Sequence, residues 1–154
     1  TITFALHGKL DKREVAPYLL AQCLGAAAGA WLVRLLNAEV VGLTLPRENL
    51  SVSAAFGIET AITCILAYVI LRAPCLVGLS LPRIALLVGG AVGLNAYLFG
   101  PMTGASMNPA RTFGPAWVAG NFDHLWLYLF APLSGGLLAL ALHKAAPPKE
   151  AGCC

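Results

Sequence analysis

Hydrophobic residues fill four long stretches of the chain, and short polar segments separate them. Three of these stretches, about 16–36, 54–71 and 124–143, reach the roughly 17 to 25 residues that an α-helix needs to cross about 30 Å of hydrocarbon. A fourth stretch, about 84–100, is just long enough. The pattern therefore predicts an all-α membrane protein with four transmembrane helices.

Composition agrees with this pattern. Hydrophobic residues make up 58% of the chain and charged residues only 11%, proportions that do not suit a soluble domain of this length. The formal net charge is +3, but the basic residues are spread over loops and do not cluster on one face with aromatic residues. This distribution argues against binding to nucleic acid. The expected surroundings are a lipid bilayer.

The basic residues orient the spans. They form three clusters, before the first span, between the second and third, and after the last: Lys9, Lys12, Arg13, Arg72, Arg83, Lys144 and Lys149. Alternating spans place all three clusters on one side, which the positive-inside rule identifies as the cytoplasm. We therefore expect a multi-pass protein of the plasma (cell inner) membrane whose C-terminal tail, 144–154, is cytoplasmic.

Few residues offer catalytic or metal-binding chemistry. The five cysteines show no metal-ligand spacing, and a thiol inside an apolar span usually packs as a small hydrophobic side chain. His7, His124 and His143 lie far apart, at or near the ends of spans, with no Ser or Cys nucleophile evidently paired to them. We expect no enzymatic activity, no cofactor and no bound metal.

One polar segment interrupts the apolar sequence between the third and fourth spans. Asn108 is a good helix N-cap and Pro109 suits the first helical position, so a short helix is expected over about 108–119, with Arg111 one turn in. Its first amides and positive dipole end would be exposed. Because a bilayer tolerates non-helical backbone only within protein or beside a cavity, the segment is a candidate pore. The alternatives are that it merely begins a buried helix and that Arg111 anchors to lipid phosphate.

The residues before Asn108 are small or flexible: Gly104, Ala105, Ser106 and Met107. Such a run lets backbone carbonyls line a narrow passage. Together with the helix start, the segment offers hydrogen-bond donors, acceptors and one fixed cation.

An internal repeat relates the first and last spans. Residues 21–26, with the pattern Ala-Gln-x-x-Gly-Ala, resemble residues 131–136, with Ala-Pro-x-x-Gly-Gly. Thr1 lies twenty residues before the first pattern and Thr112 lies nineteen before the second. Transport proteins commonly build one site from two such repeats, each with a broken helix. Residues 1–8 are therefore expected to end a first half-helix, in a chain truncated at its N-terminus.

The run 100–115, Gly-Pro-Met-Thr-Gly-Ala-Ser-Met-Asn-Pro-Ala-Arg-Thr-Phe-Gly-Pro, resembles the second signature loop of the major intrinsic proteins, the aquaporins and glycerol facilitators. Within that family, the sequence of this segment resembles nodulin-like or bacterial-type members most. The resemblance implies a bundle of six helices and two half-helices, usually a homotetramer with one pore per protomer. Residues 1–154 would form a single partial domain of this kind.

The resemblance also implies roles for individual residues. Asn108, Pro109 and Ala110 match the pore signature, and the run 104–107 matches the carbonyl ladder. Arg111 matches the arginine of the outer selectivity filter, and spacing places two further filter positions at Ala96 and Ala105. Strict water channels carry a histidine at the position of Ala96.

Two small filter residues favour a passive channel for water and small neutral solutes such as glycerol, urea or metalloid hydroxy acids. A strictly water-selective channel and a non-conducting, truncated assembly subunit are the alternatives. No nucleotide loop or array of coupling carboxylates suggests energy-driven transport.

Glu59 lies inside the second predicted span, where a carboxylate is costly unless it finds hydrogen-bond donors. The residue alone leaves two hypotheses open, a structural support or a proton relay. The family resemblance favours the first, because a glutamate at this place typically holds backbone amides of the pore loop.

Overall fold

The computed structural model of the protein describes residues 1–36, 42–76 and 79–146. In these residues the chain forms helices and no strands: α1 (Ile2–His7), α2 (Lys12–Leu36), α3 (Val52–Arg72), the 3-10 helix η1 (Ala73–Cys75), α4 (Leu81–Thr103), α5 (Pro109–Ala119) and α6 (Leu125–Ala145). Four segments are long and apolar enough to cross a membrane, namely α2, α3 with η1, α4 and α6. The prediction of an all-α protein with four such helices is confirmed.

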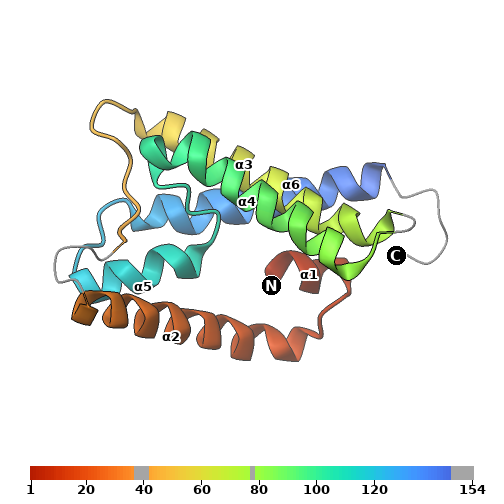
Figure 1. The fold of residues 1–154 in the computed structure, drawn as a ribbon, viewed down its shortest axis with the longest axis horizontal. Helices are drawn as coiled ribbons and strands as arrows, with labels where there is room; N and C mark the ends of the chain where they lie inside the picture. Colours follow the sequence, from red (N-terminus) through yellow and green to blue (C-terminus); the bar gives the residue numbers. More distant parts are fainter. Residues whose placement is uncertain (37–41, 77–78, 147–154) are drawn as a thin grey trace.

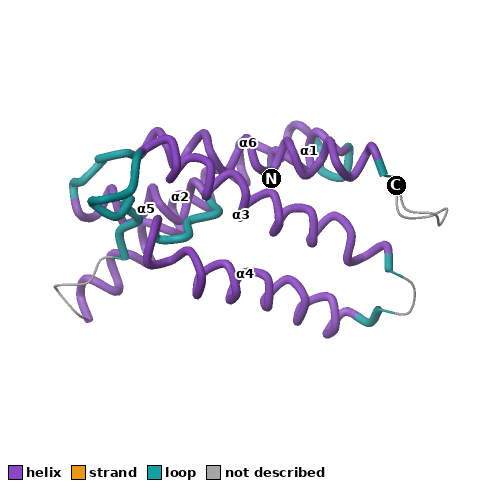
Figure 2. The backbone as a smooth tube through the Cα atoms, turned by 90° about the horizontal axis from the view of Figure 1, so that it is seen from above, coloured by secondary structure: helices purple, strands orange, loops and turns teal. Residues whose placement is uncertain are grey.

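Short and long helices have different places in the bundle. Figure 1 shows α1 and α5 between the long helices, each beginning near the middle of the molecule and running toward opposite ends. Seen from above in Figure 2, α3 lies between α6 on one side and α4 on the other. Both short helices therefore begin inside the bundle and do not run its full length.

The helices extend beyond the apolar stretches because polar residues cap them. The Asp11 carboxylate accepts a hydrogen bond from the Arg13 amide at 2.9 Å, and α2 begins at Lys12, four residues before the stretch 16–36. Ser51 caps α3 by accepting from the Ala54 amide at 3.2 Å. At the far end, α6 continues to Ala145, into the segment 144–154 expected to be a tail. Residues 147–154 lie outside the described part of the chain.

Two pairs of helices pack through small residues. In the first pair, α6 crosses α3 at Gly135, where an added methyl group would overlap the Thr60 carbonyl. In the second, α5 crosses α2 at Gly114, where a methyl group would overlap the backbone of Ala26. Small residues let helix backbones approach where lipid supplies no hydrophobic drive. Residues 25–30 of α2 are all glycine or alanine. Unlike Gly114 and Gly135, the two glycines among them, Gly25 and Gly29, have no atom of the described structure near an added methyl group.

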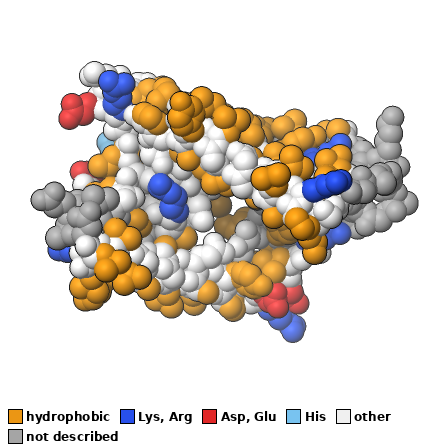
Figure 3. Space-filling view, in the orientation of Figure 1, with side chains coloured by type: hydrophobic (Ala, Val, Ile, Leu, Met, Phe, Trp, Pro, Cys, Tyr) orange, Lys and Arg blue, Asp and Glu red, His pale blue; other side chains and the backbone are white. Residues whose placement is uncertain are grey.

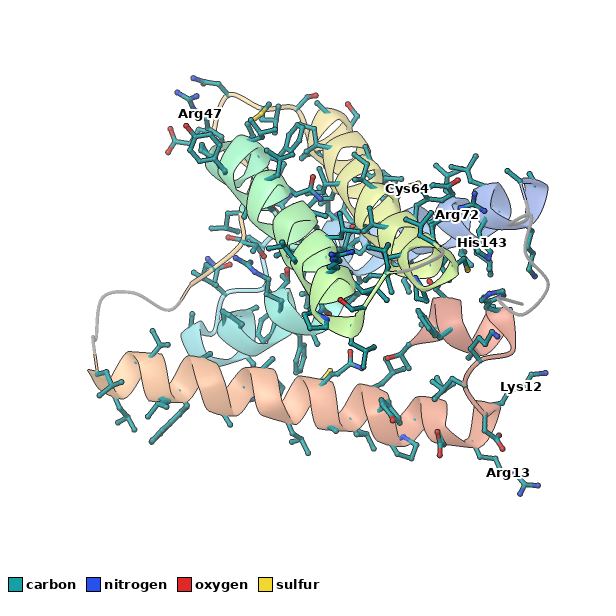
Figure 4. All side chains as sticks on the ribbon, turned by 45° about the vertical axis from the view of Figure 1, so that its right-hand side comes forward. Lys12, Arg13, Arg47, Cys64, Arg72 and His143 are labelled. Atoms are coloured by element: carbon teal, nitrogen blue, oxygen red, sulfur yellow. The ribbon has the colours of Figure 1, made fainter. Side chains whose placement is uncertain are left out.

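Charged and apolar side chains are segregated over the surface. Figure 4 shows Lys12, Arg13 and Arg72 at one end of the bundle and Arg47 at the opposite end. Figure 3 shows hydrophobic side chains over much of the length between the ends. Leu24 on α2 and Leu86 on α4 are both more than two-thirds exposed. The four long helices thus present an apolar surface of the kind that lipid or other membrane helices cover.

Candidate functional site

Helix α5 begins inside the bundle with a well-formed cap. Asn108 is extended, with φ −155° and ψ 118°, and its side-chain oxygen accepts a hydrogen bond from the Ala110 amide at 3.0 Å. Pro109 at the first helical position has no amide hydrogen to satisfy. The side-chain nitrogen of Asn108, Nδ2, therefore keeps both of its hydrogens, and no residue of the described chain accepts them. A free donor group stands at the positive end of this short helix.

The pore loop, residues 104–107, leads into this helix with unusual backbone angles. Gly104 has φ 81°, and the two non-glycine residues Ala105 and Met107 have φ 42° and φ 53°. Left-handed conformations of non-glycine residues cost of the order of 1–3 kcal/mol each and persist only when their surroundings hold them. The contacts of the pore loop must therefore supply this support.

One buried carboxylate provides part of the support. Glu59 on α3 is fully buried, and its two oxygens accept from the backbone amides of Ser106, at 2.9 Å, and Met107, at 3.0 Å. Oε1 also accepts from the Thr103 hydroxyl at 2.7 Å. In the described part of the chain no cation pairs with this carboxylate. Its donors are the loop amides and a hydroxyl, and it does not line the central cavity.

Two residues to which the sequence analysis gave no supporting role, Thr103 and Tyr128, complete this side of the loop. The Thr103 hydroxyl accepts from the Ala105 amide at 3.2 Å, and the buried Tyr128 hydroxyl donates to the Thr103 carbonyl at 2.6 Å. A tyrosine hydroxyl buried in an apolar span needs a partner, which was an available signal for Tyr128. Nothing in the sequence indicated that the partner lay at the pore loop.

A central cavity of about 620 Å³ lies beside this loop and the start of α5. Residues from α1 to α6 and from the pore loop line it, among them Thr1, Thr3, Gln22, Thr63, Leu66, Ile70, Val92, Ala96, Ala105, Ser106, Met107, Asn108, Pro109, Ala110, Arg111 and Leu133. Figure 3 shows the molecule hollowed near the middle of the face in view. The first residues of α1 and of α5 meet at the same cavity, although 107 positions separate Ile2 from Pro109.

Most of the predicted site residues come together there. The signature residues Asn108, Pro109 and Ala110, and all three predicted filter residues, line the cavity. Arg111 is exposed in it and forms no ion pair within the described residues. Gly104 does not line the cavity: it lies under Thr44, whose Cα would be 3.0 Å from a Cβ at this position.

The arrangement gives the cavity two kinds of wall. Asn108, Arg111 and the first turn of α5 offer donors and positive potential, while leucine, isoleucine and valine side chains supply an apolar wall. Such a lining suits small neutral molecules that carry hydroxyl or carbonyl oxygens, and it opposes cations. Within the described residues no cluster of His, Cys, Asp and Glu could hold a metal ion.

Known proteins with similar sequences include proteins named as aquaporins. The chain is 35% identical to aquaporin NIP3-1 of Zea mays over 152 residues, which is 97% of this chain and 50% of the maize protein. It is 37% identical to nodulin-26 of Glycine max, over 89% of this chain and 51% of that one, and 34% identical to human aquaporin-4, over 94% and 46%. The chain therefore spans about half the length of the curated relatives it matches.

A solved structure has the same fold. The aquaglyceroporin from Plasmodium falciparum superposes with a TM-score of 0.84 at 25% identity, over 93% of this chain and 68% of the other. Residues 1–143 match the family described as Major intrinsic protein. That match, together with the fold, agrees with the expectation that the chain is not an enzyme. The chain belongs to the major intrinsic protein family.

Proposed function

We propose that this protein forms a passive transmembrane channel for water and for small neutral solutes such as glycerol, urea or metalloid hydroxy acids. The observation that supports this most directly is the cavity, which Asn108 and Arg111 line together with two alanines, Ala96 and Ala105. Small residues at both positions leave room for molecules larger than water. Nodulin-26 and the aquaglyceroporin are among the proteins to which the chain is similar.

The proposed pathway works by hydrogen bonding and electrostatics alone. A solute oxygen accepts from the free side-chain amide of Asn108 and from the Arg111 guanidinium, while backbone carbonyls of the cavity-lining residues 105–107 accept from its hydroxyls. The positive end of α5 and the unpaired Arg111 repel cations. Solutes then move down their gradients without an energy source.

The bundle supports proposals about membrane placement and assembly. Lys12, Arg13 and Arg72 lie at one end of the long helices (Figure 4), and the positive-inside rule would make this end cytoplasmic together with the end of α6. We place the protein in the plasma (cell inner) membrane as a homotetramer. Lipid or neighbouring protomers would cover the exposed apolar faces of α2 and α4.

Flux measurements on the full-length protein test the proposed solutes. Stopped-flow light scattering on proteoliposomes gives water permeability from shrinkage and glycerol permeability from re-swelling. We expect both to exceed those of empty liposomes. Ala96→His should lower glycerol permeability by about tenfold or more while water still passes, because an imidazole narrows the cavity and adds a donor and acceptor.

A matched variant separates narrowing from general damage. Tyr97→His introduces the same imidazole one residue along α4, at a side chain that is 80% exposed and does not line the cavity, so both permeabilities should stay unchanged. Water flux without glycerol flux in the wild type would favour a strictly water-selective channel. Neither flux, in folded protein, would favour a non-conducting assembly subunit.

A further inference from the structure

Three buried hydroxyl groups connect the pore loop to a distant surface segment. Thr44, in the loop 42–50 before α3, lies 2.6 Å from Thr112 on α5, measured between their hydroxyl oxygens. The Thr112 oxygen lies 2.7 Å from that of Ser106, and the Ser106 hydroxyl donates to the Asn108 carbonyl at 2.9 Å. Each of the three residues is at most 3% exposed.

We call Thr44, Thr112 and Ser106 the hydroxyl chain, and its hydrogen bonds run in one direction. A hydroxyl has one hydrogen to donate, and Ser106 uses its hydrogen on the Asn108 carbonyl. Thr112 must therefore donate to Ser106, and Thr44 must donate to Thr112. Every hydrogen in the chain is used, and Thr112 is the only member that both accepts from one hydroxyl and donates to another. Aligned hydrogen bonds of this kind polarise and strengthen each other.

Two members of the hydroxyl chain are sequence neighbours of predicted filter residues, which do not themselves belong to it. Ala105 directly precedes Ser106, and Arg111 directly precedes Thr112. Neither Thr44 nor Thr112 lines the cavity, so neither contacts a solute there. Loop 42–50 has a second link, in which the Arg47 amide donates to the Met102 carbonyl at 2.8 Å. The loop thus covers the outside of the pore loop.

We propose that Thr112 is a positioning residue that sets solute selectivity. Its hydroxyl ties loop 42–50 to the pore loop and so fixes the width between Ala105 and Arg111. The inference rests on the proposed channel function, which supplies the solutes to be selected. Breaking the hydroxyl chain frees the pore loop to relax from its left-handed conformations, and the passage between Ala105 and Arg111 widens on average.

The direction of the hydrogen bonds in the hydroxyl chain predicts a different order of variant effects from the order that simple packing of Thr112 would give. Thr112→Val keeps the shape but leaves the Thr44 hydroxyl without an acceptor, and the Ser106 oxygen then accepts only the long hydrogen bond, 3.4 Å, from the Asn108 backbone amide. Thr44→Val breaks the same bond but leaves Thr112 still donating to Ser106, so its effect should be smaller. Thr112→Ser keeps the hydroxyl and loses only a methyl group. A packing role for Thr112 would give the opposite order, with the serine variant more affected than the valine variant.

The first test is the ratio of glycerol to water permeability for the full-length protein in proteoliposomes. We expect Thr112→Val, which breaks both hydroxyl hydrogen bonds of Thr112, to raise this ratio by about fivefold, the factor that corresponds to two bonds at the lower end of the net value of a hydrogen bond. Thr44→Val should raise it by about twofold, and Thr112→Ser should leave it at the wild-type value. An unchanged ratio in Thr112→Val, or an equal change in Thr112→Ser, would overturn the proposal.

A second readout does not depend on transport. Amide hydrogen exchange should become faster in residues 43–50 and in residues 104–107 together in Thr112→Val, and in neither segment in Thr112→Ser. If the wild type conducts nothing, the channel proposal fails. Unchanged amide exchange in Thr112→Val would show separately that the hydroxyl chain does not hold the loops.

A second pair of variants applies if Thr112→Val does not fold. Faster amide exchange in Thr44→Val than in Thr44→Ser would then support the role of the hydroxyl chain, and equal exchange in the two variants would contradict it.

Discussion

The pore loop is held from two sides by different chemistry. On one side, the Glu59 carboxylate lies on α3, a helix that packs against both α6 and α4, and it accepts from two backbone amides. On the other side, Thr44 and Thr112 form neutral hydrogen bonds that begin on a surface loop. Hydrogen bonds to a charged group contribute about 1.5–3 kcal/mol and neutral ones about 0.5–1.5 kcal/mol. The first side therefore dominates the stability of the loop, and the second can tune its position.

Removing the charge at Glu59 should have the largest effect. Glu59→Gln keeps the size of the side chain but can turn its NH₂ group toward the Met107 amide, so that two donors face each other at a site where Oε2 now accepts at 3.0 Å. A buried amide left without its acceptor costs about 1–3 kcal/mol. We expect a clear loss of thermal stability in detergent and water permeability reduced about tenfold or more.

Glu48 offers the matched control, because it is an exposed carboxylate in the loop before α3. Glu48→Gln removes the same charge from the protein and should change neither quantity. Wild-type stability in Glu59→Gln would mean that a neutral acceptor suffices there. The two sides of the pore loop would then not differ in strength.

Ser106 belongs to both sides, and truncating its side chain separates them. Ser106→Ala keeps the backbone amide that donates to Glu59 but removes the oxygen that accepts from Thr112. We expect a loss of about 1–2 kcal/mol in unfolding free energy and a raised glycerol-to-water ratio, with water permeability largely kept. Ser53→Ala, at an exposed serine, controls for the loss of a hydroxyl. A collapse as severe as that of Glu59→Gln would contradict the division of roles.

The smallest effect is expected from Tyr128→Phe. The variant keeps the ring and loses only the hydroxyl that donates to the Thr103 carbonyl at 2.6 Å. Because the carboxylate contacts stay intact, stability should fall by about 1 kcal/mol, measured as a lower midpoint of thermal unfolding. Tyr97→Phe, at a side chain that is 80% exposed, should leave the midpoint unchanged. A larger loss in Tyr128→Phe than in Ser106→Ala would contradict this ranking of the two hydroxyl groups.

Several features of this protein follow from local sequence. Stretches of apolar residues long enough to cross a bilayer predict the four long helices, because hydrocarbon leaves the backbone no other partner than itself. Asn108 and Pro109 predict the start of α5 for an equally local reason, since a cap bonds to an amide two residues away. The helix ends are less predictable, because caps such as Asp11 add polar turns that hydropathy does not count.

The tertiary structure alone decided what surrounds the pore loop. Thr103 and Glu59 are 44 residues apart and Thr44 and Thr112 are 68 apart, yet each pair forms a short hydrogen bond. A buried polar group must find some partner, but the sequence does not say which one, because the packing of α3 and of loop 42–50 brings the partners together. The sequence by itself therefore determined the membrane helices, the half-helix and the family, and the fold decided which side chains hold the pore loop.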